Sequence, residues 1–405
     1  MNSGSEAVDR VLKGQLCTGC GLCASVSGGA IVMQMEAPGY SRPKQLGPVT
    51  PDAERLIAGA CPGVVVAEWE EAPHTHPYWG PWRQVVTGHA VDPEVRFEGS
   101  SGGAISALVI HALQIGLVDR VIHVKADPQN PTRNIVTCSS TPAEVLGGAG
   151  SRYTASSPLT QMDGILADGG SIAFIGKPCD VSALRRLGEF DPRVARHVPL
   201  MLSFFCGGMP SHDGVERMLA TMGTHRDEVT AFRYRGRGWP GSAAATTIDG
   251  RVFEMSYADS WGGHLSKEVQ FRCKICPDAV GGVADIACAD AWYGGESGYP
   301  QFNEQDGRSL IVVRSEAGER LLESARAQKA LDVEALDINE IDLMQPSQAR
   351  RKRLVLARTA ALTVTGQPKP RTRGTHVFEA AKAATIGEAG RNFAGTVRRI
   401  VLGRR

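Results

Sequence analysis

The pattern of apolar and polar residues predicts alternating strands and helices through the middle of the chain. A strand (VVTGHAV), a glycine-rich turn, a helix beginning at residue 104 and a second strand (DRVIHVKA) follow one another. The helix is indicated by four apolar residues at helical spacing: Ile105, Leu108, Ala112 and Leu113. Such a strand-helix-strand unit is typical of an α/β protein.

A second alternation follows, and it places cysteines at the ends of strands. Residues 171–187 (SIAFIGKPCDVSALRRL) are consistent with a buried strand, a tight turn and a helix, and residues 197–211 (HVPLMLSFFCGGMPS) with another buried strand and turn. Ligands in α/β proteins gather at the carboxyl ends of strands. Antiparallel strands are expected from about residue 225 to 265, and the α/β pattern resumes with SLIVVRS at 309–315.

These patterns divide the 405 residues into three predicted units. Residues 1–82 form a small, ferredoxin-like N-terminal cluster module that ends in a Pro-rich linker or exposed connection at 70–82. Residues 83–345 form a larger α/β core with some antiparallel strands. Residues 346–405 form a basic, helical C-terminal tail. The predicted fold class is therefore α/β with a cluster module and a tail.

Charge is unevenly distributed along the chain. The formal net charge is only +1, which gives no indication of a nucleic-acid partner. Residues 350–405, however, carry 14 Lys and Arg against 2 Glu, whereas the remaining residues carry 30 against 41 Asp and Glu. We expect this tail to be a solvated extension with a flexible link at 367–374 and a last helix at about 376–402. The alternatives are docking of that helix on a partner subunit or weak contact with an anionic membrane surface.

The N-terminus lacks the apolar region of a signal peptide, and the best apolar run, residues 104–118, is too short to span a membrane. We therefore expect a cytoplasmic protein. In that reducing compartment the ten cysteines are expected to bind metal or to serve redox chemistry.

Cys17, Cys20 and Cys23 have the double two-residue spacing of a 4Fe-4S cluster motif. In the compact bacterial motif a fourth cysteine followed by proline comes four residues later, where this chain has Ser27 and Gly28. Cys61, which is followed by Pro62, is the predicted fourth ligand. Structural zinc, which also takes four thiolates, is the alternative.

A second set of cysteines is dispersed along the core. The C-x2-C pair Cys273 and Cys276 needs two further ligands, which Cys179 in GKPCD and Cys206 in FFCGGMPS are placed to supply. Zinc fits this set as well, and Cys179 or Cys206 alone would be typical of an inert buried thiol. Cys138 and Cys288 remain, and we interpret them as ordinary buried cysteines.

Two glycine-rich turns are candidates for binding a phosphate-containing cofactor. EGSSGGAIS (98–106) leads into a helix, where free backbone N–H groups and the helix dipole favour an anion. Ser100 or Ser101 as a simple helix N-cap is the alternative. GAGSRYTAS (148–156) is the second turn, and a plain surface turn is its alternative.

With these motifs in their observed order, the chain resembles the coenzyme F-420 (F420) hydrogenase/dehydrogenase beta subunit family from about Leu16 to Ser315. The stretches that carry the resemblance are CTGCGLC, FEGSSGGAISALVIHALQIGLVDRVIHV, GSRYTASS, GKPCDVSALRRL, FFCGGMPS, RGRGWPG and CKICPDAVGGVADIACADAW. One departure is Ala289, at a position where the family pattern has Gly.

The resemblance implies an iron-sulfur flavoprotein with FAD, two 4Fe-4S clusters and coenzyme F-420 as a potential co-substrate. It implies that FAD lies on residues from the two glycine-rich turns: Ser100, Ser101, Gly102, Gly103, Ala104, Gly150, Ser151, Arg152 and Tyr153. It implies that the core cluster is held by Cys179, Cys206, Cys273 and Cys276. Lys177 is expected either to place a positive charge near the flavin or cluster, or to be a solvated turn lysine.

The predicted function is electron transfer between a two-electron carrier, either coenzyme F-420 or an organic substrate, and 4Fe-4S clusters through FAD. Ferredoxin or another redox subunit and a small-molecule substrate are the expected partners. The alternatives are an electron-input subunit without a substrate of its own and a zinc-stabilised binding module. The sequence does not select a catalytic acid or base among the ten histidines.

Overall fold

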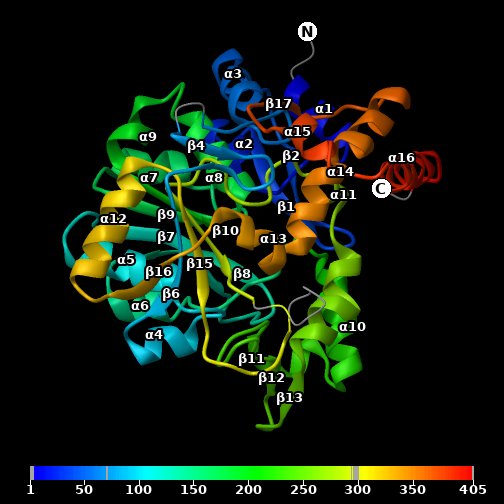
Figure 1. The fold of residues 1–405 in the computed structure, drawn as a ribbon. Coiled ribbons are helices and arrows are strands. Elements are labelled where there is room, and N and C mark those ends of the chain that lie inside the picture. Colours follow the sequence, from blue (N-terminus) through cyan, green and yellow to red (C-terminus); the bar gives the residue numbers. More distant parts are fainter. Residues whose placement is uncertain (1–3, 70–71, 293, 295–300, 404–405) are drawn as a thin grey trace.

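A mixed β-sheet runs through the centre of the molecule, with helices on both faces (Figure 1). The computed structural model describes residues 4–69, 72–292, 294 and 301–403. The strand order is β16-β6-β15-β14-β10-β9-β7-β8. In that order the strands are Leu331–Ala335, Gln84–Ala90, Ser309–Val313, Ile286–Asp290, Leu200–Phe204, Ile172–Gly176, Arg120–Ala126 and Asn134–Ser139. From β14 to β7 the pairing is parallel, and the outer strands join antiparallel. The prediction of a mixed α/β protein is confirmed.

Side chains of the central strands alternate between two buried cores. In β9, Ala173 packs with α5 (Ala104–Gln114) and α12 (Glu316–Ala327) on one face of the sheet. Its neighbours Ile172 and Phe174 pack on the opposite face with α7 (Met162–Asp168), α8 (Pro178–Leu187) and α9 (Pro192–His197). The period of two residues is the one that a strand imposes. Burial on both faces explains why these strands are almost wholly apolar.

The parallel pair β9 and β10 positions two of the cysteines. Gly176 at the end of β9 lies opposite Ser203 in β10. Each strand is followed directly by a turn, so Cys179 in the first turn of α8 and Cys206 after β10 leave the sheet at the same edge. The predicted strand, turn and helix over 171–187 are confirmed. The strands β6 and β7 flanking α5 are also present, although four other strands lie between them in the sheet.

The N-terminal segment contains helices α1 (Glu6–Lys13), α2 (Leu22–Val26) and α3 (Pro51–Ala60) and the antiparallel hairpin β1 (Ile31–Glu36) and β2 (Tyr40–Gln45). Leu22 and Ala60 from this segment are buried in the same core as α8. The predicted domain boundaries remain predictions.

The segment expected to be a linker is partly buried. It forms the antiparallel pair β4 (His74–His76) and β5 (Gly80–Trp82), while its residues 70 and 71 lie outside the described part of the chain. Trp79 is fully buried and its indole N–H donates to Asp342 at 2.9 Å. The alternative of an exposed connection is therefore wrong for part of the segment, because the large side chain of Trp79, among proline and glycine residues, is buried.

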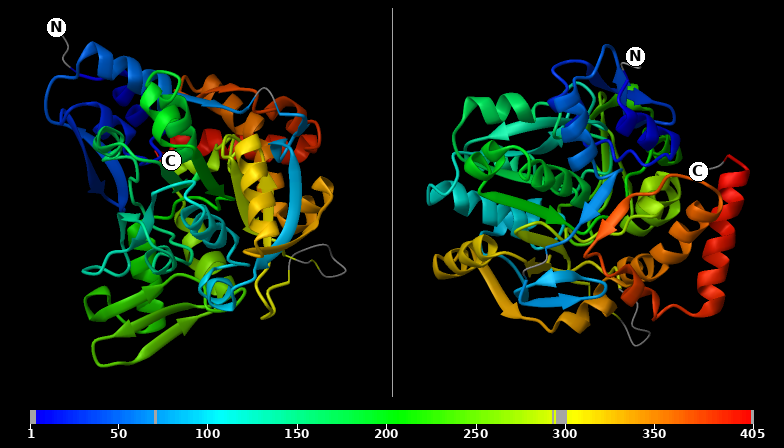
Figure 2. Two further views of the ribbon diagram at one scale, coloured as in Figure 1. Left: turned by 90° about the vertical axis from the view of Figure 1, so that its left-hand side faces the viewer. Right: turned by 90° about the horizontal axis from the view of Figure 1, so that it is seen from above.

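The expected antiparallel region is present as a separate sheet of β11 (Val229–Arg233), β12 (Ala243–Thr247) and β13 (Val252–Met255). It packs on α10 (His212–Met222) and lies apart from the N-terminal elements, as Figure 2 shows.

The C-terminal segment differs from the expected solvated extension. Helix α14 (Pro346–Val364) buries Leu354, Val355 and Leu362, and it is followed by β17 (Arg371–Arg373), α15 (Val377–Ala381) and α16 (Ile386–Val401). Strand β17 pairs in parallel with β3 (Val65–Ala67), so the link predicted to be flexible contains a strand. These helices lie beside the N-terminal elements (Figure 1).

Across the described ranges, no helix is long and apolar enough to cross a bilayer.

Candidate functional site

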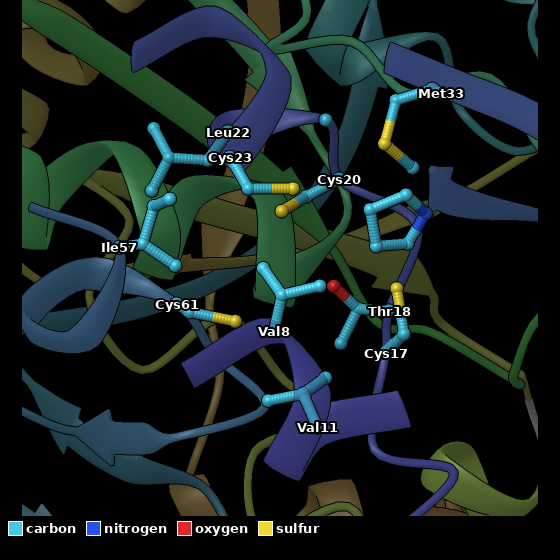
Figure 3. A pocket seen from close by; sticks show the side chains of 12 residues that line it. Val8, Val11, Cys17, Thr18, Cys20, Leu22, Cys23, Met33, Ile57 and Cys61 are labelled. Atoms are coloured by element: carbon cyan, nitrogen blue, oxygen red, sulfur yellow. The ribbon is translucent and has the colours of Figure 1, made fainter. Parts of the chain in front are cut away.

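The first four cysteines line one pocket, although Cys61 is far from the others in sequence. The pocket contains roughly 400 Å³ of space that no atom fills, part of it open to solvent, and the side chains of Cys17, Cys20, Cys23 and Cys61 surround it. Figure 3 shows the thiols of Cys20, Cys23 and Cys61 turned toward its interior. The apolar side chains of Val8, Val11 and Ile57 are also part of the lining.

Local backbone geometry brings these cysteines together. Gly19 and Gly21 have φ values of +74° and +88°, which other residues rarely adopt, and a Cβ at Gly21 would meet the backbone N of Thr160 at 2.9 Å. Cys61 caps the end of α3, where its N–H donates to the carbonyl of Ile57 at 2.9 Å. Burial, followed by the neighbouring thiol of Cys17, raises the pKa of Cys61 to about 11.

The second set also gathers in one region, at the carboxyl edge of the parallel strands. The backbone N–H of Met209 points at the sulfur of Cys273 at 3.4 Å, and a Cβ at Gly208 would lie 3.4 Å from the Cβ of Cys273. Burial, followed by the adjacent thiol of Cys273, raises the pKa of Cys206 to about 12. Burial also raises the pKa of the Cys179 thiol, and nearby groups that include Cys206 and Cys273 act in the same direction.

Arg272 lies between the two sets. Its side chain is fully buried, it donates from Nη2 to the carbonyl of Pro62 at 3.0 Å, and its charge acts on the thiols of both Cys61 and Cys276. Its buried Nε has no hydrogen-bond partner among the described residues. A buried cation with an unused donor is suited to a negatively charged group, such as a thiolate-bound cluster, on either side.

No three His, Cys, Asp or Glu side chains of the described residues are arranged to hold a single metal ion.

The two glycine-rich turns expected to bind FAD lie side by side. The hydroxyl of Ser100 accepts from the backbone N–H of Ser151 at 2.5 Å, which joins the turns directly. Gly103, with φ +73°, is the N-cap of α5, so the first N–H groups of that helix have no intrahelical partner. Ser101 donates to the carbonyl of Arg308 at 2.7 Å, and the N–H of Gly102 donates to the hydroxyl of Ser309 at 3.0 Å. Ala104 begins the helix and is buried.

The second turn borders a pocket of roughly 380 Å³, part of it open to solvent, that is lined by Gly147 to Arg152 together with Ala126, Phe232 and Arg233. Arg152 itself is occupied structurally, because it donates to Asn134 and to the backbone carbonyls of Pro131, Arg133 and Phe232. Tyr153 packs against Trp261, with ring centroids 4.8 Å apart.

Lys177 is buried, which contradicts the solvated-lysine alternative. Its Nζ lies 2.6 Å from Asp180. Burial alone would lower the pKa of Lys177, but Asp180 and the thiol of Cys179 raise it above its ordinary value, so the amine is charged. Its contacts place it with the second cysteine set rather than with the glycine-rich turns.

Sequence reasoning missed a buried ion pair behind the first turn. Arg235 binds Asp290 through two hydrogen bonds of 2.7 and 2.6 Å, and the indole N–H of Trp239 donates to the same carboxylate at 2.8 Å. The carbonyl of Arg235 accepts from Ser100 at 3.3 Å. The quoted motif RGRGWPG contains both Arg235 and Trp239 and was the available signal. Ala289, the departure from the family pattern, lies in β14 opposite Leu310.

The two remaining cysteines differ from each other. Cys288 is buried in the core, as expected. Cys138 is exposed on the edge strand β8, so its predicted burial was wrong. Its place on an edge strand, next to the last residue of that strand, leaves the side chain uncovered.

Comparison with known proteins shows the family. The sequence model of the coenzyme F420 hydrogenase/dehydrogenase beta subunit N-terminus matches residues 85–162, and that of the C-terminus matches residues 169–339. The chain belongs to this family of oxidoreductase subunits. Cys17, Cys20, Cys23 and Cys61 and the helix α14 lie outside the matched residues.

Several individual relatives are named as redox proteins. The chain is 27% identical over 274 residues to coenzyme F420 hydrogenase subunit beta of Methanococcus voltae, an alignment covering 66% of this chain and 88% of that one. It is 21% identical to coenzyme F420-dependent sulfite reductase of Methanocaldococcus jannaschii (82% and 49% covered). It is 23% identical to chloroplastic 7-hydroxymethyl chlorophyll a reductase of Oryza sativa subsp. japonica (60% and 50% covered). The alignments with the last two relatives span about half of their length.

The fold is shared with a chain of the F420-reducing NiFe hydrogenase complex from Methanosarcina barkeri. The TM-score is 0.54 at 20% identity, with 71% of this chain and 96% of the other covered. At that identity the likeness concerns the fold alone.

Proposed function

We propose that this protein is an iron-sulfur flavoprotein that passes electrons between a two-electron carrier and two 4Fe-4S clusters through FAD. The observation that carries the proposal is the convergence of Cys17, Cys20, Cys23 and Cys61 on one pocket. Four thiolates at the corners of a cubane are the usual ligands of such a cluster. The family membership supports redox work.

The chain offers a place for each group. The first set of cysteines holds one cluster, and Cys179, Cys206, Cys273 and Cys276 hold the other. Lys177 and Arg272 supply buried positive charge next to the thiolates. Burial raises the pKa of Cys61 and of Cys206, so binding of a cluster to these thiols releases protons.

FAD binds across the joined glycine-rich turns. The N–H groups at the start of α5 would donate to its phosphates, and Arg233, which pairs with Glu98, borders the second pocket. When bound there, FAD would supply the exchange between a hydride, which carries two electrons, and single electrons. Coenzyme F420 is the proposed co-substrate, because several relatives carry its name.

Anaerobic purification followed by iron, sulfide and flavin analysis tests the proposal. We expect about eight irons and one FAD per chain. Cys61→Ser should lose about half of the iron, whereas Cys138→Ser, at an exposed thiol outside both sets, should lose none. Unchanged iron in the Cys61→Ser variant would refute the distant ligand. A colourless protein with zinc and no iron would favour the zinc-stabilised binding module instead.

An electron-input subunit without its own substrate is the second candidate, because the Methanococcus voltae relative is named as a subunit. Ferredoxin or another redox subunit would then be the partner. Turnover of coenzyme F420 by the purified chain alone favours the enzyme, and turnover only with a co-purifying protein favours the input subunit. The cytoplasmic location and the contact of α16 with an anionic membrane remain predictions.

A further inference from the structure

Helix α14 brings three cations to the backbone of the second cysteine set. Arg351 donates to the carbonyls of Cys206 at 2.9 Å and Gly207 at 2.5 Å, Lys352 donates to the carbonyl of Pro277 at 2.7 Å, and Arg358 donates to the carbonyl of Lys274 at 2.6 Å. Each acceptor belongs to a segment that carries Cys206, Cys273 or Cys276. A helix outside the residues matched by the family models therefore closes this site.

The three cations differ in their other side-chain partners. Lys352 forms a buried ion pair with Glu68 at 3.1 Å. Arg358 also binds the side chain of Asn392 on α16, which fixes its position. Arg351 has no carboxylate within 4 Å among the described residues, and its charge acts on the thiols of both Cys206 and Cys276. Its charge is therefore available to whatever anion the thiolates hold.

We propose that Arg351 is a positioning residue of the second cluster site: its guanidinium holds the Cys206–Gly207 turn in place, and its charge raises the reduction potential of the cluster. This inference rests on the proposed function. A thiolate-bound cluster becomes more negative when it takes up one electron, so a nearby cation stabilises the reduced state more than the oxidised state. Removal of the cation must then lower the potential.

The packing of the helix supports a fixed position for this guanidinium. Leu354 and Val355 are buried on α14, and Leu362 is fully buried in the core that also contains Cys17, Phe271 and Ile275. Strand β17 then pairs with β3, which follows Cys61. Helix α14 is thus held in place by contacts near both cysteine sets.

Arg351→Gln in the iron-loaded full chain is the test, and Arg350→Gln is the matched control. Arg350 is the preceding residue, and its replacement removes the same charge. Its side chain, however, is exposed and pairs with Glu388 on α16 at 2.8 Å. In redox titrations followed by electron paramagnetic resonance, Arg351→Gln should make one cluster about tenfold harder to reduce, which is about 59 mV for one electron. The other cluster should be unchanged, and Arg350→Gln should change neither.

Iron analysis supplies the second readout. Loss of about four irons in Arg351→Gln, with iron restored by Arg351→Lys, would also support the proposal through the positioning of the turn. Full iron content with both potentials equal to the wild type would overturn it. The same would hold if Arg350→Gln had the same effect as Arg351→Gln. Wild-type protein without iron and sulfide would refute the proposed function and this inference together. If the wild type contains both clusters, a failure of the Arg351→Gln prediction refutes this inference alone.

Discussion

The guanidinium of Arg272 donates to the carbonyl of Pro62 and so ties the second cysteine set to the first. Arg272 immediately precedes Cys273, and Pro62 immediately follows Cys61. The bond is 3.0 Å long and buried, and it joins residues 210 positions apart. The relative position of the two sets is therefore fixed by a contact between their own neighbours.

Arg272→Gln should lower the free energy of unfolding by about 1–3 kcal/mol, because the buried carbonyl of Pro62 loses its donor. Urea denaturation of the iron-loaded protein measures the change. Arg10→Gln is the control, since Arg10 also donates to a backbone carbonyl, that of Lys369, but at an exposed site. A loss no larger in Arg272→Gln than in Arg10→Gln would show that the link contributes nothing to stability.

Short-range patterns were sufficient to predict the core of the fold. The apolar run before Lys177 and Pro178 predicted β9 and α8, and the Cys-Pro pair predicted that Cys61 returns to the other three cysteines. Contacts between distant segments were missed. Strand β17 lies in a Pro- and Arg-rich stretch and exists because it pairs with β3, about 300 residues earlier.

The same limit applies to the basic C-terminal segment. Its charge favours solvation, whereas Arg351 binds a carbonyl 145 positions away in the chain. A sequence shows that a residue is charged but not which backbone carbonyls the fold will bring to it. The prolines and glycines around Trp79 likewise indicate an exposed turn, although its side chain is buried.

Gly150→Ala should reduce the bound flavin by about tenfold at limiting FAD, because alanine is strained by roughly 1–2 kcal/mol at the positive φ of +100°. Its Cβ would also lie 2.9 Å from Nη1 of Arg233. Gly147→Ala is the matched control in the same pocket, since Gly147 has φ −59° and the nearest atom to an added Cβ is 3.4 Å away. Flavin absorbance after gel filtration measures retention. Equal flavin in the two variants would contradict the assignment of this turn.

Asp290→Asn should destabilise the protein by about 3 kcal/mol, because it leaves the buried guanidinium of Arg235 without its counter-charge. Only 3% of the Arg235 side chain is exposed, so water cannot replace the lost carboxylate. Asp306→Asn, at an exposed carboxylate 3.9 Å from Arg96, should cost less than about 0.5 kcal/mol. Urea denaturation at neutral pH compares the variants. A similar small loss in both would mean that the hydrogen bond from Trp239, not the charge, holds Asp290.

The buried imidazole of His123 should make stability fall as the solution is acidified. Its Nε2 lies 2.8 Å from the hydroxyl of Ser139, and a Cβ at Gly148 would meet its Nδ1 at 2.8 Å, so the ring packs under the second glycine-rich turn. Burial lowers the pKa of His123 to about 4. The unfolded chain, with an ordinary pKa of about 6.5, therefore binds a proton that the folded protein excludes between these two values.

The stabilisation is present above about pH 6.5 and is lost as the pH falls toward 4, so this one group should account for about 2 kcal/mol between pH 7 and 5. Urea denaturation at both pH values measures it, and His123→Gln should remove that part of the pH dependence whatever its effect at pH 7. His74→Gln, at an exposed histidine on β4, should retain the wild-type dependence. If the His123→Gln variant lost as much stability on acidification as the wild type, the proton would be binding elsewhere in the unfolded chain.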